Sequence, residues 1–365
     1  MPAQLSIPPG SSYCPQFDGL RAIAIIGVLI EHFGLTLPTF FRYGPVGVRF
    51  FFALSGYFIT LSLWKLQSQS ITSPGRHGSH LFQFYLKRLL RIGPAFYATL
   101  IVGVLLGVVD VRRHFFWLAT FQVNHLIAYL GYWPDSISHF WSLAVQEQFY
   151  LLWPLLILYL PRRWFLPCMA ALILLGPGFR FFCIFSGISM FFRWVTIFGC
   201  LDSFAVGALI AYLKRSGEWG KLSQSPVISF VLPFVAFSCF FLGRAFMVLP
   251  EGHLGLAFVE SFDAVFLAWL LITTASGIKG VCGSVLGWPP LVYLGKISYG
   301  IYVYHMFVLN FLSPRFFPWI AEDAHGTSLE RLAVLFVLTL ALASFSWHYF
   351  EKPFINWKNS LSASA

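Results

Sequence analysis

The sequence predicts an all-α fold: a polytopic bundle of transmembrane helices. Its 365 residues are 58% hydrophobic and only 10% charged, whereas soluble globular proteins average about 45–50% and about 25%. Apolar runs recur from Phe17 to Phe350 with short polar breaks between them, and crossing a bilayer takes about 20 residues. We therefore expect one transmembrane domain over residues 1–354, followed by a short polar C-terminal tail at 355–365.

About ten spans are expected from hydropathy and helix-breaking residues. They lie near residues 17–37, 44–64, 90–110, 139–160, 164–185, 194–213, 226–248, 256–276, 291–313 and 331–351. The segment 112–135 is also apolar and aromatic, but Arg112, Arg113 and Pro134 interrupt it. We expect this segment to be interfacial or re-entrant, although it has room for one more span.

The positive charges gather in particular breaks between the spans. The formal net charge is +10, yet no basic amphipathic helix or Lys/Arg tract indicates a nucleic-acid partner. Alternate breaks hold most of the Lys and Arg, such as Lys87, Arg162 and Lys214, while the others hold acidic residues such as Glu251 and Asp323. The positive-inside rule then predicts a multi-pass protein of the cell inner (plasma) membrane with cytoplasmic N- and C-termini.

Several familiar sequence features are absent. The residues before Phe17 carry no Lys or Arg, so we expect no signal peptide and a first span that is retained. Six scattered cysteines without a CxxC pair predict neither disulfides nor a metal site. The sequence also lacks a phosphate-cradling Gly-rich loop, an HExxH pair and a Gly-x-Ser-x-Gly elbow.

The first span carries four ionisable residues, Asp18, Arg21, Glu31 and His32. Such groups are costly in hydrocarbon and by default mark a functional cavity. On a helix, Arg21 and His32 return to within ~20° of one face and lie ~16 Å apart in depth, so we expect them to line one groove. Asp18 can pair with Arg21. The alternative is helix-end snorkelling by Asp18 and Arg21, together with a satisfied buried histidine.

A second cluster of charge opens the third span. Arg88 and Arg91 are three positions apart and share one helix face at the expected cytosolic boundary. Guanidinium groups in this arrangement suit a ligand that carries several phosphates. The alternative is that the pair anchors the helix under the positive-inside rule.

The fourth span places a carboxylate within the membrane. Glu147 lies eight residues after His139, which corresponds to ~12 Å of helix and to a depth similar to that of His32. A histidine and a carboxylate that meet at this depth suit deprotonation of a hydroxyl. The alternative is a helix-packing hydrogen bond from Glu147 to a neighbouring Trp or Tyr.

Polar residues on two other segments are candidates for lining the same cavity. Ser298, Tyr302 and His305 follow i, i+4, i+7 spacing and so form one helical stripe, and Ser142 opens the fourth span. For the stripe, the ordinary role of tyrosine at a membrane interface is the stronger interpretation. Ser55 stands beside Gly56 in the second span, which indicates close helix packing.

Six short motifs occur in a characteristic order along the chain. They are Phe17-Asp18-Gly19-Leu20-Arg21-Ala22 with the spacing to His32, Phe52-Ala53-Leu54-Ser55-Gly56-Tyr57, the Arg88 and Arg91 pair, Trp141-Ser142-Leu143 through Glu147-Gln148-Phe149-Tyr150, Ser298-Tyr299 through His305, and Tyr349-Phe350-Glu351-Lys352-Pro353. Over nearly its whole length the chain thereby resembles the acyltransferase-3 family of integral membrane O-acyltransferases, which modify surface polysaccharides, exported glycans, Nod factors and macrolides.

The resemblance implies roles for the same residues. His32 is the expected catalytic residue with Arg21 as its partner, Arg88 and Arg91 contact the acyl donor, and Glu147 is an essential acid. The implied donor is acetyl-CoA or another acyl-CoA that binds as a substrate, with no permanently bound cofactor. The implied acceptor is a hydroxyl of a sugar, polysaccharide, glycolipid or related molecule. Gln146 stands where the family commonly has a second Glu, so a role that needs two adjacent carboxylates is not expected.

Together these features predict a membrane-bound O-acyltransferase in which His32 is a general base or a transient acyl carrier. The main alternative is a polytopic glycan or lipid transporter or flippase that uses the His, Glu and Arg set as a substrate or proton path. A sensor or scaffold without catalysis is a third class. The paired arginines favour a phosphate-rich donor, and no inverted repeat of the kind found in many transporters is evident.

Overall fold

The computed structural model describes residues 13–34, 44–72, 77–217, 219–248, 255–318 and 329–363, and within these ranges it contains helices and no strand. The all-α prediction is confirmed. The longer helices are α1 (Pro15–His32), α2 (Gly44–Thr72), α3 (His77–Leu105), α7 (Phe140–Tyr159), α8 (Arg162–Phe185), α10 (Leu201–Arg215), α12 (Leu232–Val248), α13 (Gly255–Ser276), α16 (Ser298–Phe307), α19 (Leu329–Ser346) and α20 (Lys352–Ala363).

Short helices link these elements. They are α4 (Val109–Arg113), α5 (Phe115–Ala119), α6 (Val123–Leu130), α9 (Met190–Val195), the 3₁₀ turn η2 (Ile197–Cys200), α11 (Trp219–Ser223), α14 (Gly280–Leu286), α15 (Pro289–Lys296), α17 (Ser313–Phe316) and the π-helical segments η3 (Val227–Val231), η4 (Val308–Leu312) and η5 (Trp347–Glu351). None of the three helices within residues 109–130 is long enough to cross a bilayer, because even the eight residues of α6 extend only ~12 Å.

Seven helices in the described part of the chain are long and apolar enough to cross a membrane. They occupy residues 44–67, 81–105, 162–185, 197–215, 227–246, 257–276 and 329–357, and each overlaps a predicted span. The chain is therefore a multi-pass membrane protein. Helices α1 and α7 have comparable lengths, 18 and 20 residues, but their candidate site residues and the neighbouring glutamines lower their hydropathy.

In the last part of the chain, the helices are divided and end at other residues than the sequence predicted. The expected span at 291–313 is divided at Ile297 into α15 and α16, which continues as η4 and α17. Helix α15 packs on α1, while α16 packs on α19. Part of the predicted polar tail is helical, because α20 continues from η5 and extends to Ala363.

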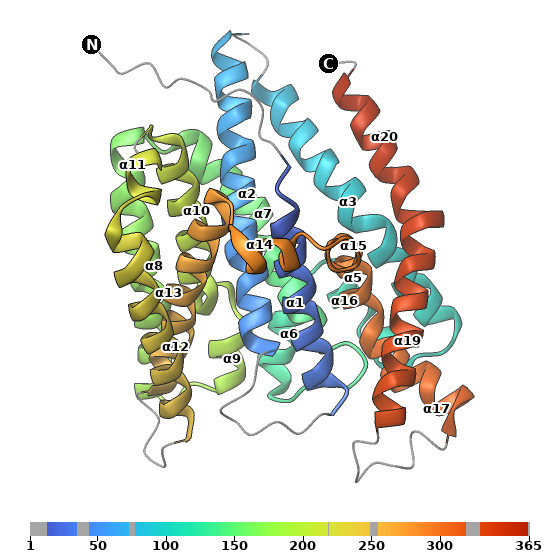
Figure 1. Cartoon of the computed structure of the whole chain (residues 1–365). Coiled ribbons are helices and arrows are strands. Elements are labelled where there is room, and N and C mark those ends of the chain that lie inside the picture. Colours follow the sequence, from blue (N-terminus) through green and yellow to red (C-terminus); the bar gives the residue numbers. More distant parts are fainter. Residues whose placement is uncertain are drawn as a thin grey trace.

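Helix α1 ends earlier than expected. Its last residue is His32, and Gly34 follows in a left-handed conformation with φ of 88°; residues 35–37 of the predicted span lie outside the described residues, as do the loop acids Glu251, Glu322 and Asp323. His32 is thus in the last turn of a helix. The end of α1 and the start of α2 lie together near the lower end of the bundle (Figure 1).

Helix α2 lies at the centre of the packing. It contacts α1, α7, α10 and α13, and in Figure 1 it runs between the group of α8 to α13 and the group of α3, α19 and α20. The contact with α10 is a close backbone approach: a Cβ on Gly56 would lie 2.0 Å from the Phe204 carbonyl oxygen, and one on Gly207 1.9 Å from that of Ala53. The close packing that the sequence predicted at Gly56 is confirmed.

Stacked aromatic rings complete this contact. The Phe204 ring stacks on Phe52 of α2 at 4.7 Å and on Phe149 of α7 at 4.1 Å between ring centroids. All three side chains are buried. The stack joins α2, α7 and α10 into one rigid unit, against which the site residues of α2 and α7 are positioned.

Candidate active site: an arginine cavity and a histidine cavity

Three arginines from two helices line one cavity inside the bundle, here called the arginine cavity. Its volume is about 150 Å³. Arg21 of α1 and Arg88 and Arg91 of α3 line it, together with polar residues of α2, α7 and α16: Ser55, Ser142, Gln146, Tyr150, Ser298, Tyr299 and Tyr302. Arginine-rich walls of this kind favour an anionic ligand.

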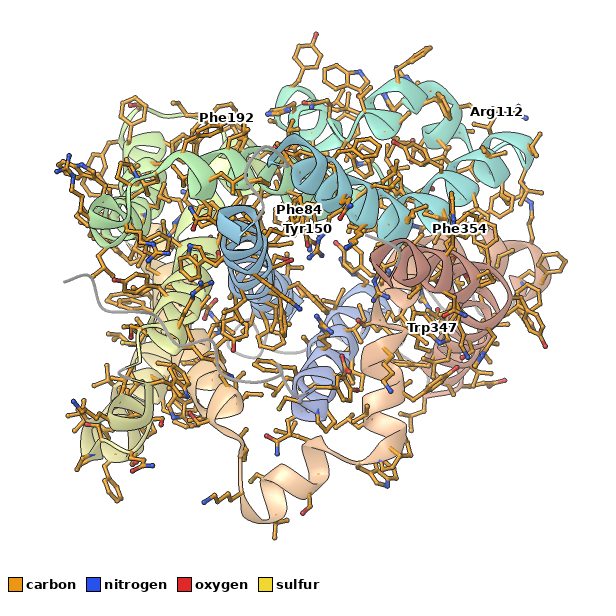
Figure 2. All side chains as sticks on the ribbon, turned by 90° about the horizontal axis from the view of Figure 1, so that it is seen from above. Phe84, Arg112, Tyr150, Phe192, Trp347 and Phe354 are labelled. Carbon is orange, nitrogen blue, oxygen red and sulfur yellow. The ribbon has the colours of Figure 1, made fainter. Side chains whose placement is uncertain are left out.

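Aromatic rings hold these guanidinium groups in place. The Arg88 Cζ atom lies 5.2 Å from the centroid of the Tyr150 ring and 5.6 Å from that of Phe84, and Arg91 lies 5.6 Å from that of Trp347. In the view from above, Phe84 and Tyr150 lie close together near the middle of the bundle, whereas Arg112 and Phe192 lie at its edge (Figure 2). A cation–π interaction does not use the N–H groups of a guanidinium as hydrogen-bond donors, so these groups remain suitable for binding phosphate.

Arg21 is held by a carboxylate as well. Its Nη1 atom donates to Asp18 Oδ1 at 2.8 Å, and the Tyr13 hydroxyl donates to Asp18 Oδ2 at 2.6 Å. Burial, followed by the hydrogen bond to Asp18, raises the pKa of Tyr13, so the phenol remains a donor at neutral pH. The pairing of Asp18 with Arg21 expected from the sequence is present. Asp18 positions Arg21 and does not itself line the cavity.

Glu147 lies with the arginines and not with His32. Its carboxylate is within electrostatic range of Arg88, Tyr97 and Tyr299. The expected meeting of His32 and Glu147 at one depth was wrong, because α7 turns Glu147 toward α3 while His32 faces α16. Gln146, the position of the family's second Glu, lines the arginine cavity and donates to Ser55 Oγ at 2.7 Å and to the Tyr150 hydroxyl.

A second cavity, here called the histidine cavity, is larger, at about 350 Å³. His32 from the end of α1 and His139, which directly precedes α7, line it, together with other residues of α1, α2, α7, α9, α13, α16 and the segment before α7. These are Val28, Glu31, Gly44, Pro45, Val48, Arg49, Trp133, Ser138, Trp141, Trp194, Glu260 and Tyr302. The cavity therefore combines imidazoles, charged groups and tryptophans.

Hydrogen bonds to His305 fix the tautomer of His32. His305 Nδ1 lies 2.7 Å from the Tyr302 carbonyl oxygen, and a carbonyl only accepts, so this nitrogen carries the proton. In a neutral ring, His305 Nε2 then holds the lone pair and accepts from His32 Nδ1 at 3.0 Å. The proton of His32 is thereby on Nδ1 and the basic lone pair is on Nε2. The group that orients His32 is therefore a histidine of α16, and not the carboxylate of Glu147.

The polar stripe on α16 is divided between several environments. Ser298 lines the arginine cavity, whereas Tyr302 lines both cavities. His305 is completely buried behind His32, so the expectation that it lines a cavity was wrong. Ser142 lines the arginine cavity and its hydroxyl lies 2.6 Å from that of Tyr302, which donates to the His139 carbonyl oxygen at 2.5 Å.

The two cavities share two lining residues, Val48 and Tyr302. Arg21 lines one cavity and His32 lines the other. The prediction that both residues line a single groove was therefore wrong. Instead, two compartments adjoin at these two side chains. Because Tyr302 is held by Ser142 and by the backbone of His139, it forms an ordered boundary between them.

A buried ionic network, which was not predicted from the sequence, supports the wall of the histidine cavity. Arg180 of α8 donates to Asp202 Oδ2 at 2.7 Å and lies 3.3 Å from Glu260 Oε2. Arg49 of α2 lies 3.8 Å from both carboxylates and donates to the Gly199 carbonyl at 2.8 Å. Arg49 interrupts an apolar span, and that was the available signal, since intramembrane charges usually have a function.

The fold and the two cavities define a class: a polytopic membrane protein with an arginine-lined cavity next to a histidine-lined cavity. The described residues contain no group of three or more His, Cys, Asp or Glu side chains placed to hold a metal ion. The chain belongs to the acyltransferase-3 family, since the family's model, described as an acyltransferase domain, matches residues 15–348. The resemblance stated from the sequence motifs is confirmed.

Curated relatives fit this assignment. The chain is 27% identical to the peptidoglycan O-acetyltransferase OatA of Listeria monocytogenes over 94% of its own length and 57% of the relative's. It is 26% identical to the putative peptidoglycan O-acetyltransferase YrhL of Bacillus subtilis (93% and 55%) and 25% identical to the O-acetyltransferase OatA of Staphylococcus aureus (93% and 57%). The chain thus spans little more than half the length of these relatives. No solved structure matches it.

Proposed function

We propose that this protein is a membrane O-acetyltransferase that transfers an acetyl or other short acyl group from acyl-CoA to a hydroxyl of a glycan. The observation that carries the proposal is the arrangement of the two cavities: a compartment lined by three arginines adjoins one lined by the oriented base His32. The family match and the names of the relatives favour acyl transfer over the transporter alternative.

The donor occupies the arginine cavity. Arg88 and Arg91 bind phosphate oxygens of coenzyme A through the N–H groups that the aromatic rings leave accessible. Arg21, held by Asp18, adds a third positive charge. Glu147 lies beside Arg88 and orients this guanidinium group, which is the role that its position supports in place of a contact with His32.

The acceptor reacts from the histidine cavity. His32 Nε2 takes the proton of the acceptor hydroxyl as the oxygen attacks the thioester carbonyl carbon. The new C–O bond forms, the C–S bond breaks, and the coenzyme A thiolate leaves with the proton that His32 returns. The positive charge that His32 carries during the reaction is stabilised through its Nδ1–H bond to His305.

The positive-inside distribution of Lys and Arg supports a cytoplasmic donor side. In this arrangement acyl-CoA enters from the cytoplasmic side of the inner membrane, and the acceptor hydroxyl is presented from the opposite side. The acyl group then crosses the boundary at Tyr302 and Val48, and coenzyme A does not.

Replacing Arg88 or Arg91 with alanine is expected to weaken acetyl-CoA binding by at least tenfold. Each replacement removes a charge-assisted hydrogen bond to phosphate, worth about 1.5–3 kcal/mol, and a tenfold change corresponds to about 1.4 kcal/mol. Equilibrium binding of radiolabelled acetyl-CoA to the purified protein in detergent measures the effect. Arg163→Ala, which removes an exposed arginine at the start of α8, is the matched control and should bind as the unmodified protein does.

Equal affinity in Arg88→Ala, Arg91→Ala and Arg163→Ala would contradict the assignment of the arginine cavity to the donor. A loss of affinity that also appears with Arg163→Ala would show a general effect of net charge and would contradict it as well.

A further inference from the structure

We propose that a third cavity, at the end of the bundle predicted to be cytoplasmic, binds the phosphate group of an anionic membrane lipid. This cavity is here called the boundary cavity, and its volume is about 160 Å³. It shares no lining residue with the arginine cavity or the histidine cavity. A ligand bound there is therefore additional to the two substrates of the proposed function.

The ends of four helices form the boundary cavity. Its lining residues are Trp64 and Gln67 of α2, Ile157 of α7 and Leu160 directly after it, Arg162 and Phe165 of α8, and Tyr212 and Arg215 of α10 with Ser216 directly after it. The apolar spans of α2, α8 and α10 occupy residues 44–67, 162–185 and 197–215, so the cavity lies where these spans end. In Figure 1, α11, which follows α10 in the chain, lies near the upper end of the bundle, opposite the ends of α1 and α2 that meet below. The cavity is therefore at the level of the lipid headgroups.

Two guanidinium groups line the boundary cavity without a carboxylate partner. Arg162 and Arg215 are within electrostatic range of each other, and neither has an ion pair or a side-chain hydrogen bond within the described part of the chain. Two like charges in one cavity repel each other. An anion between them replaces this repulsion with attraction, and the planar N–H forks of arginine match the oxygens of a phosphate group.

Two neutral side chains add further hydrogen-bonding groups. The Gln67 amide and the Tyr212 hydroxyl line the cavity, and neither bonds to another side chain or backbone group among the described residues. An amide N–H and a phenol O–H both donate, and the oxygens of a phosphodiester only accept. Together with the two arginines, these donors favour a phosphate group and disfavour a cation.

Aromatic packing holds the arginine of α10 in place before any ligand binds. The Arg215 Cζ atom lies 5.9 Å from the centroid of the Trp64 ring. Trp64 contacts Phe165 at 5.0 Å and Tyr212 at 5.9 Å, and Phe165 stacks on Tyr212 at 4.9 Å between centroids. Because Trp64 and Phe165 are buried, this cluster joins α2, α8 and α10 at the cavity, and the site is preformed.

The apolar surroundings favour a lipid over a soluble phosphate compound. Ile157 and Leu160 line the cavity beside Arg162, and the neighbouring side chains of Tyr159 and Trp164 are 79% and 54% exposed. Tyrosine and tryptophan at a membrane boundary lie at the level of the headgroups, and basic pockets between helices on the cytoplasmic side bind anionic headgroups. A lipid whose phosphate lies between the guanidinium groups uses both the charges and this apolar surface, whereas a soluble phosphate compound uses only the charges.

The test measures binding of radiolabelled phosphatidylglycerol to the full chain in detergent. Binding to the unmodified protein should be saturable. The double variant Arg162→Gln, Arg215→Gln removes both charges and should weaken binding by about tenfold or more. The double variant Arg162→Lys, Arg215→Lys keeps the charges without the planar forks, and should retain part of the affinity.

Arg163→Gln is the matched control, because Arg163 is exposed and adjacent to Arg162 but does not line the cavity; it should bind as the unmodified protein does. Size-exclusion elution of each variant verifies that it is folded. Equal lipid affinity in Arg163→Gln and in the double glutamine variant would overturn the inference, and so would the absence of saturable binding.

Competition distinguishes the two sources of a phosphate group. Unlabelled phosphatidylglycerol should displace the bound lipid. Inorganic phosphate and coenzyme A at the same concentration should not displace it, because they lack the acyl chains that contact the apolar surface. Displacement by either compound at that concentration would identify a soluble phosphate ligand and would overturn the assignment to a lipid.

Discussion

Replacing His32 with alanine is expected to abolish acyl transfer while acetyl-CoA still binds. His32 lines the histidine cavity, whereas Arg21, Arg88 and Arg91 line the arginine cavity, so the loss of the imidazole does not touch the donor contacts. Loss of a general base typically lowers the rate by about 10²–10⁴-fold. The measurement is kcat for transfer of radiolabelled acetyl groups to the glycan, with acetyl-CoA affinity determined in parallel.

Two variants serve as comparisons. His125→Ala removes an exposed histidine whose ring hydrogen-bonds to the side chain of Gln122, and it should retain full activity. His305→Ala removes the acceptor of the His32 Nδ1–H hydrogen bond and should lower kcat without changing KM for either substrate. His305→Gln should recover part of the rate, because the glutamine amide oxygen can accept that hydrogen bond. Transfer by His32→Ala at a rate within threefold of the unmodified protein would refute its role as base.

Replacing Arg180 with alanine is expected to cause the largest loss of stability. Arg180 is completely buried and bonds to Asp202, Ser261 and the carbonyl groups of Gly199 and Ala257. Removing one partner of a buried ion pair typically costs about 3–5 kcal/mol, because the remaining charge stays unpaired. Thermal unfolding in detergent should show a strongly lowered midpoint or no folded protein.

The double variant Arg180→Met, Asp202→Leu distinguishes two causes of lost stability, namely a missing contact and an unpaired buried charge. Replacing both partners with apolar residues of similar size is often nearly neutral, so the double variant should be more stable than Arg180→Ala. An unfolding midpoint for Arg180→Ala equal to that of Arg163→Ala would show that the network does not stabilise the fold.

The sequence predicted much of the fold because spans can be recognised from local composition. Each of the seven long apolar helices overlaps a predicted span, and the interrupted segment 112–135 proved to consist of short helices. The ends of the helices were predicted less accurately than their positions. Helix α1 ends at His32, because Gly34 follows in a left-handed conformation. The division at Ile297 was missed, although Gly295, Lys296 and Ser298 next to it were a signal in the sequence.

The contents of the site were predicted better than its arrangement. Periodicity within one helix correctly paired Asp18 with Arg21, and the spacing of Arg88 and Arg91 correctly placed both at one cavity. The periodicity within one helix does not determine which helices face one another. For that reason Glu147 was predicted to meet His32, whereas the histidine that contacts it is His305 of α16. The contacts of Arg49 with Asp202 and Glu260 were not predicted.

In the proposed function, one chain accepts an acyl group in the arginine cavity and delivers it to a sugar in the histidine cavity. Proteoliposomes with the protein in one orientation test this proposal most directly: acetyl-CoA is supplied on the side predicted to be cytoplasmic and a disaccharide of N-acetylglucosamine and N-acetylmuramic acid only on the opposite side. We predict acetylated disaccharide with the unmodified protein, at least about 10²-fold less with His32→Ala, and about tenfold less with Arg88→Ala when acetyl-CoA is subsaturating. Acetylation that requires both substrates on the same side, or that persists without His32, would contradict the proposal.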